Sequence, residues 1–201
     1  MESIQITQVS VVRLPLRSRF RGIDYREALI FKGSQRYSEF SPFLEYEDDE
    51  AATWLRAALE FANSPLPEPK RQLIPINATL PAVRPDQVVE TLEAFGQFQT
   101  IKIKVAEVGQ DLDQDLARIA QAHKSYPDAR LRLDANGNYS VAQAMKIIRA
   151  IADYPIEYFE QPVASISELV ELRTQLAAAE IQMKIAADES IRKQSDPLEV
   201  A

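Results

Sequence analysis

The stretch IKIKV, residues 101–105, places two lysines one residue apart in a run that is otherwise apolar. Successive side chains of a β-strand point to opposite faces of the sheet. Lys102 and Lys104 are therefore predicted to share one face, while the three apolar residues share the other. Two explanations fit this stretch taken alone: the lysine face is solvated, or it carries a polar site. The surrounding sequence has to decide between them.

Strand-like and helix-like segments alternate along the chain from Leu73 onward. The predicted strands contain, in order, LIPIN, TIKIKV, ARLRLDAN, IEYFEQP and QMKIAADES. The helices predicted between them span 85–95, 111–124, 140–153 and 165–179. Strict alternation of this kind is typical of a parallel sheet whose strands are joined by right-handed helical crossovers. The fold class is therefore predicted to be α/β.

The first part of the chain follows a different order. Strands are predicted over 4–14 and 25–32, followed by a helix that begins at Asp48 with acidic residues in its first turn. The segment SPLPEPKRQ contains three prolines and is the predicted linker. We therefore expect a small α+β domain over 1–72 and a parallel α/β domain over 73–201.

Charged residues mark the carboxyl ends of the last four predicted strands. These residues are Lys104, Asp134, Glu160 and Asp188. One strand–helix unit separates each from the next, so we expect them at equivalent heights in the sheet. In a (β/α)8 barrel this end of the strands forms the active-site face. An open, doubly wound sheet would need a switch point and usually a glycine-rich loop, and the sequence shows neither.

We therefore expect a (β/α)8-type barrel of which about five strands are present in this chain. A complete barrel has eight strands in ~250 residues. An unclosed barrel exposes sheet edges and half of its core. The expectation is that the chain is truncated, or that a partner chain completes it.

Composition narrows the possible chemistry. The 201 residues include no cysteine and one histidine, His123, which falls in an amphipathic helix pattern and is expected on the helix surface. Disulfide scaffolds, thiolate metal sites and histidine-based catalysis are therefore excluded. The five glycines are too scattered for a nucleotide-binding fingerprint, and the net charge of -7 argues against a nucleic-acid surface. The remaining possibility is chemistry on a small molecule that is carried out by lysines and carboxylates.

The sequence has no apolar run of the ~18 residues that a membrane span needs. Its start, MESIQITQVSVVRLP, alternates like a strand and does not resemble a leader. We therefore expect a cytoplasmic protein without a membrane partner; its oligomeric state stays open.

Three carboxylates at one end of a barrel suggest a metal site. Asp134, Glu160 and Asp188 would repel one another unless a cation lay between them. Ligands that are all oxygen select a hard divalent ion, and we expect Mg²⁺. The alternative is that each acid is an ordinary strand-end or helix-cap residue. Two ammonium groups facing a barrel interior need anionic partners, and a metal-bound acidic substrate would supply them.

Four motifs in order, KIKV, LRLDANG, YFEQP and AADES, resemble those of the enolase superfamily. The resemblance implies that Asp134, Glu160 and Asp188 are the metal ligands and that Lys104 is the acid–base residue. It places Lys102 beside the substrate carboxylate, and Asn136 and Glu189 next to the ligands. Lys184 falls at the opposite end of its strand and is expected to be structural.

The N-terminal stretches RFRGIDYREALIFKG and EFSPFLEYEDDEAATWL resemble the o-succinylbenzoate synthase family within that superfamily. This resemblance implies a lyase of menaquinone or phylloquinone biosynthesis that removes water from a cyclohexadiene carboxylate after lysine takes an α proton. It also implies that the N-terminal domain caps the barrel, with Phe20, Arg21 and Ser41 in loops over the substrate.

Other functions remain open at this point. An N-acylamino-acid racemase, a dipeptide epimerase or a muconate-type cycloisomerase of the same superfamily would use the same ligands. A further catalytic lysine, expected on the next strand, would lie beyond Ala201. The alternative that is not an enzyme is a barrel fragment without catalytic activity.

Overall fold

The computed structural model describes residues 4–20, 23–193 and 195–201, and for 17–20 it describes the backbone alone. The chain divides into two compact units, Met1–Gln72 and Leu73–Ala201. Of the helices in the described part of the chain, none has both the length and the apolar character that crossing a bilayer requires.

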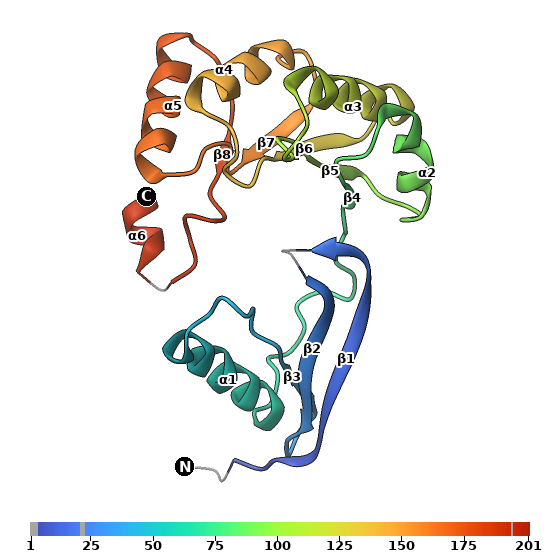
Figure 1. Ribbon diagram of the computed structural model, residues 1–201, viewed down its shortest axis with the longest axis vertical. Helices are drawn as coiled ribbons and strands as arrows, with labels where there is room; N and C mark the ends of the chain where they lie inside the picture. The colour runs from blue at the N-terminus through green and yellow to red at the C-terminus, as the bar shows by residue number, and fades with distance from the viewer. Residues whose placement is uncertain (1–3, 21–22, 194) are drawn as a thin grey trace. The chain divides into compact units, whose positions relative to one another are not determined.

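The first unit is an antiparallel sheet with one helix (Figure 1). Its strands lie in the order β1-β2-β3 and are β1 (Thr7–Phe20), β2 (Ile23–Lys32) and β3 (Tyr37–Phe40). The helix α1 (Asp48–Asn63) begins at the residue predicted from its acidic first turn. Strand β3 was not predicted, because YSEF is too short and too polar to be recognised locally. Its pairing with β2 is what defines it.

Helix α1 packs closely against β2 and the turn that follows it. Ala58 and Ala62 are buried against Phe31. A Cβ atom at Gly33 would lie 2.5 Å from the carbonyl oxygen of Ala62, closer than any real contact allows. Only glycine therefore permits the helix to approach this turn.

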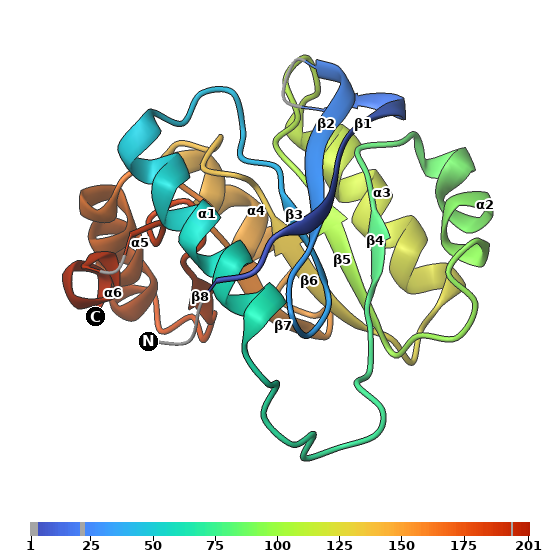
Figure 2. The same ribbon diagram turned by 90° about the horizontal axis from the view of Figure 1, so that it is seen from below.

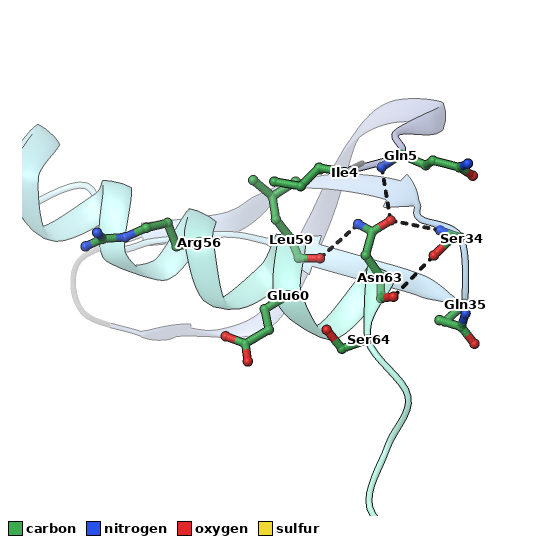
Figure 3. Close-up of a pocket in the computed structure, with 9 residues that line it drawn as sticks. All are labelled: Ile4, Gln5, Ser34, Gln35, Arg56, Leu59, Glu60, Asn63 and Ser64. Carbon is green, nitrogen blue, oxygen red and sulfur yellow. Dashed lines mark hydrogen bonds between the residues drawn. The ribbon is translucent and has the colours of Figure 1, made fainter. Parts of the chain in front are cut away.

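Asn63, the last residue of α1, ties the helix to both neighbouring segments (Figure 3). Its Oδ1 accepts hydrogen bonds from the backbone N–H groups of Gln5 and Ser34, at 3.1 Å each. Its Nδ2 donates to the carbonyl of Leu59, and its own carbonyl accepts from Ser34 Oγ. These residues line a cavity of about 620 Å³. Both polar atoms of the Asn63 side-chain amide form hydrogen bonds within the chain. We therefore assign Asn63 a structural role, in which it connects α1 to the segments that carry Gln5 and Ser34.

The second unit is a five-stranded parallel sheet in the order β4-β5-β6-β7-β8 (Figure 2). The strands are β4 (Ala78–Leu80), β5 (Thr100–Lys104), β6 (Arg130–Asp134), β7 (Ile156–Glu160) and β8 (Ile185–Ala186). The helices are η1 (Pro85–Gln87), α2 (Val88–Glu93), α3 (Leu112–Ser125), α4 (Val141–Ala150), α5 (Ile166–Ala178) and α6 (Asp196–Val200). The helices α2 to α5 lie on one face of the sheet (Figure 1). The predicted α/β alternation is confirmed.

The core fills the space between this sheet and its helices. Ile101, Ile103, Leu131, Leu133 and Phe159 are fully buried, and they belong to one apolar cluster with residues of the helices. On β5, Lys102 and Lys104 alternate with the buried isoleucines and are themselves half-buried. The predicted division of IKIKV into an apolar face and a lysine face is therefore confirmed.

Two strand predictions need correction. LIPIN is not a strand: Leu73, Ile74 and Ile76 are 86%, 74% and 63% exposed, and pairing with β5 starts only at Ala78. Pro75 has no N–H to give to a sheet ladder, which explains why pairing begins after it. At the other end, only Ile185 and Ala186 of QMKIAADES pair with β7.

Two helix predictions also differ from the structure. Helix α6, which starts next to a proline, was not predicted. His123 lies on α3 as expected, but it is half-buried, because its ring packs edge-on against Tyr154 at 5.1 Å. Its expected location on the helix surface is therefore only partly correct.

Candidate active site

Three of the predicted site residues lie in one row across neighbouring strands. Lys104 of β5 is in register with Asp134 of β6, and Asp134 is in register with Glu160 of β7. Each is the last residue of its strand. All three side chains therefore emerge at the carboxyl end of the parallel sheet, where barrel enzymes place their chemistry.

The two lysines of β5 form a compact charge network with these acids. Lys102 Nζ lies 2.6 Å from Glu160 Oε1 and 2.9 Å from Asp134 Oδ2. Lys104 Nζ lies 2.5 Å from the same Asp134 oxygen and 2.8 Å from Asn136 Oδ1. The Asn136 N–H donates to the other Asp134 oxygen at 3.0 Å. Two cations and two anions thus balance each other at the strand ends.

This network shifts the pKa values of its members in different directions. Burial raises the pKa of Asp134, but the hydrogen bonds from Lys104 and Lys102 outweigh burial, so the net pKa is lowered. The pKa of Glu160 is raised, chiefly by burial and further by the nearby charges of Asp134 and Asp188, despite the bond from Lys102. Burial lowers the pKa of Lys102, but its bonds to Glu160 and Asp134 raise it to about 12.

Asp188 and Glu189 follow β8 and approach the network from its other side. Asp188 is exposed, and its N–H donates to Gln161 Oε1 at 2.9 Å. Glu189 Oε1 accepts a hydrogen bond from Asn136 Nδ2 at 2.8 Å. Glu189 Oε2 is buried, and no partner for it lies among the described residues.

The three expected metal ligands do not form a closed cluster. In the described ranges, no group of three or more histidine, cysteine, aspartate or glutamate side chains is arranged to hold one ion. Lys102 instead joins Asp134 to Glu160, while Asp188 is exposed and its charge contributes to the raised pKa of Glu160. The ion pairs with Lys102 offset the repulsion between the carboxylates of Asp134 and Glu160.

The donor set nevertheless suits a hard divalent cation. Apart from the lysine amines, the side chains at this site offer carboxylate and amide oxygens as possible metal ligands. Mg²⁺ prefers oxygen ligands. The raised pKa of Glu160 and the unpartnered oxygen of Glu189 both mark places where a cation would relieve an unfavourable charge or a missing contact.

The remaining predicted residues belong to other segments of the chain. Lys184 is exposed just before β8, as expected for a residue at the far end of its strand. In the first unit, Ser41 follows β3; its carbonyl accepts from Arg26 and its hydroxyl donates to Glu39. Phe20 ends β1, where its backbone pairs with Ile23. Arg21 lies outside the described residues.

Two features that support the site were not predicted from the sequence. Gln161, which follows Glu160, is fully buried and accepts hydrogen bonds from the N–H groups of Asp188 and Ser190. On α3, Asp115 and Arg118 are buried although charged. Helical spacing already places both on the face that carries Ile119 and Ala122, and this was the available signal.

Comparisons with known proteins identify the family to which the two units are similar. Residues 11–62 match the family described as Enolase N-terminal domain-like, and residues 85–200 match the one described as Enolase C-terminal domain-like. The o-succinylbenzoate synthase of Mycolicibacterium smegmatis is 47% identical over 97% of this chain and 59% of its own length. The o-succinylbenzoate synthase of Mycobacterium tuberculosis H37Ra is 44% identical over 97% of this chain and 58% of its own length. The chain thus spans somewhat less than three fifths of these relatives.

Two solved structures have a similar fold. A dipeptide epimerase from Enterococcus faecalis V583, complexed with Mg and the dipeptide L-Leu-L-Tyr, has a TM-score of 0.68 and 23% identity, covering 97% of this chain and 71% of its own. An o-succinylbenzoate synthase from Thermosynechococcus elongatus BP-1, complexed with Mg in its active site, has a TM-score of 0.62 and 20% identity, covering 96% and 71%.

Proposed function

Because the chain belongs to the enolase superfamily, we propose that it contributes the base and the metal ligands of an o-succinylbenzoate synthase. The substrate is then a cyclohexadiene carboxylate, and the product is the aromatic o-succinylbenzoate. The observation that carries the proposal is the ion-pair network of Lys102, Lys104, Asp134 and Glu160 at the carboxyl ends of three adjacent strands. The identities of 44–47% to curated o-succinylbenzoate synthases favour this substrate over others.

In this proposal Asp134, Glu160 and Asp188 hold Mg²⁺, and Glu189 and Asn136 lie next to them. When bound, the ion would offset the negative charge that develops on the substrate carboxylate, an effect worth several kcal/mol. It would also replace Lys102 as the counter-ion of Asp134 and Glu160. Lys102 Nζ would then be free to donate to a carboxylate oxygen of the substrate.

Lys104 is the proposed base. Its neutral amine accepts the proton from the carbon next to the substrate carboxylate. The electron pair left behind forms a ring double bond as the carbon–oxygen bond to the hydroxyl group breaks. The Lys104 ammonium gives the proton it has taken to the leaving hydroxyl, which departs as water, so the net change is the loss of one water molecule and the neutral amine is restored. Asn136, which accepts a hydrogen bond from Lys104 Nζ, holds that amine near Asp134 between turnovers.

The test is dehydration activity of the whole protein in the presence of Mg²⁺, followed by the appearance of the aromatic product. Replacing Lys104 by alanine should lower kcat by about 10²–10⁴-fold, as expected for loss of a general base. Lys146→Ala, on the exposed face of α4, is the matched control and should retain full activity. Racemisation of N-succinyl amino acids without dehydration would contradict the proposed substrate. Absence of both activities would favour a non-catalytic barrel.

A further inference from the structure

Two charged residues of α3 lie in the protein core, away from the ion pairs described above. Asp115 and Arg118 are each 1% exposed, and Arg118 Nη1 lies 2.8 Å from Asp115 Oδ1. Taking two charges out of water is unfavourable unless hydrogen bonds compensate. Apolar side chains of the same size would fill this position at less cost. The pair therefore calls for an explanation beyond stability.

The contacts of Arg118 supply one part of the explanation for this buried pair. Its Nη1 also donates to the carbonyl of Lys104 at 2.9 Å, and its Nε donates to the carbonyl of Val83 at 2.8 Å. Its Nη2 donates to Gln110. One planar guanidinium thus joins the end of β5, the loop after β4 and the loop that leads into α3.

The contacts of Asp115 supply the other part. Its Oδ2 accepts from the Ala106 N–H at 3.0 Å and from the Tyr139 hydroxyl. Ala106 has a φ of +59°, a left-handed conformation that surrounding contacts must maintain in a residue other than glycine. Tyr139 is 6% exposed and belongs to the segment after β6 that also carries Asn136. Asp115 therefore links the chain after Lys104 to the chain after Asp134.

We propose that Asp115, Arg118 and Tyr139 form a brace that positions Lys104 for proton transfer. The brace holds the Lys104 carbonyl on one side of Val105 and the Ala106 N–H on the other, so the backbone that carries the lysine cannot shift along β5. Through Tyr139 it also fixes that backbone relative to the segment after Asp134. The inference rests on the proposed function for the role of Lys104 as the base.

The three brace residues are positioning residues, because they contact the backbone of Lys104 and not its amine. Their loss should therefore lower kcat more than it changes KM. A displacement of a catalytic group by about 1 Å can cost 10²-fold in rate. A purely structural role predicts a different pattern, in which activity falls only in proportion to the unfolded fraction.

The experiment compares Tyr139→Phe, Arg118→Met and Arg118→Lys in the whole protein. Tyr139→Phe keeps the ring and removes one hydrogen bond, so it should fold and should lower kcat about tenfold, with KM within about threefold. Arg118→Met should lower kcat about 100-fold. Arg118→Lys should recover part of that loss, since an ammonium can still reach one of the carbonyls.

Leu172→Ala is the control for stability. Leu172 is fully buried on α5, so its truncation destabilises the core without touching the brace. At a temperature where every variant is folded, Leu172→Ala should retain the wild-type kcat. The inference is overturned if Tyr139→Phe and Arg118→Met also retain it, or if Leu172→Ala loses as much as they do.

A second measurement separates this inference from the proposed function. Hydrogen exchange of the Ala106 amide, followed by NMR, should speed up at least tenfold in Arg118→Met and stay unchanged in Leu172→Ala. If Lys104→Ala retains turnover, the proposed base is wrong, and the exchange rate alone decides on the brace. Unchanged protection of Ala106 in Arg118→Met would then overturn it.

Discussion

Lys102 Nζ lies 2.6 Å from Glu160 Oε1, although 58 residues separate the two in the chain. The bond reaches from β5 past β6 to β7, and on the way the same ammonium contacts Asp134 at 2.9 Å. A lysine thus occupies the position between two carboxylates that we propose for a metal ion. This competition leads to the first two predictions.

Replacing Lys102 by methionine should make the metal-free protein less stable at neutral pH. The folded-state pKa of Lys102 is raised from 10.5 to about 12, so its contribution is fully present below pH 10.5 and is lost as the pH rises towards 12. Because Lys102 is partly exposed, solvent screening limits this contribution to about 1 kcal/mol. Chemical unfolding in a chelator should show a difference from wild type at pH 9 that shrinks by pH 11.5. A difference that is the same at both pH values would contradict the prediction.

Replacing Lys102 by glutamine should tighten Mg²⁺ binding. An ammonium next to Asp134 and Glu160 repels an incoming cation and must give up its two ion pairs when the ion binds. Calorimetric titration should show an increase in affinity of about tenfold, which corresponds to ~1.4 kcal/mol. Asp134→Asn is the opposite control and should weaken binding. Weaker binding by the glutamine variant would show that Lys102 supports the ion instead of competing with it.

Replacing Gln161 by leucine should weaken Mg²⁺ binding without disturbing the pair of Lys102 and Glu160. The buried amide accepts hydrogen bonds from Asp188 and Ser190, and it donates to Ser190 Oγ at 2.8 Å. Without it the segment that carries Asp188 loses its support, and residues that orient metal ligands typically contribute 10–100-fold in affinity.

The matched control for Gln161 is Gln182→Leu, an exposed glutamine in the segment before β8. It should bind Mg²⁺ like the wild type in the same calorimetric titration. Equal affinities for both glutamine variants and the wild type would exclude Gln161 from the support of the site.

Replacing Gly33 by alanine should destabilise the first unit. The added Cβ would lie 2.5 Å from the Ala62 carbonyl oxygen, which cannot easily move because it accepts bonds from Gln35 and Arg36. Overpacking of this kind costs about 1–3 kcal/mol. Ser34→Ala, which removes only an exposed hydrogen bond to Asn63, should cost about 0.5 kcal/mol. Unfolding midpoints followed by the fluorescence of Trp54 in α1 would check this order.

Much of the fold could be predicted because its signals are local. Asp111, Ser140 and Ser165 each accept a hydrogen bond from the third residue of the helix that they precede. These caps, together with the apolar spacing that follows them, mark the starts of α3, α4 and α5. The alternation within IKIKV likewise follows from strand geometry, so the buried and the polar face of β5 were predictable.

Other features were decided by contacts between distant parts of the chain. LIPIN is apolar enough to resemble a strand, yet sheet pairing begins after it, and YSEF becomes a strand only because β2 offers an edge. The partners of Lys102 could not be read from the sequence, since three carboxylates at strand ends are equally compatible with a shared cation and with lysine counter-ions. The structure shows that Lys102 pairs with both Asp134 and Glu160.

The sequence by itself therefore determined the order of the elements, the polar face of β5 and the residue types at the strand ends. It did so because helix caps and side-chain periodicity act over a few residues. Only the tertiary structure decided which charges pair and why Asp115 and Arg118 are buried. Their partners are backbone groups of other loops, such as the carbonyl of Val83, 35 residues from Arg118, and packing alone brings these groups into reach.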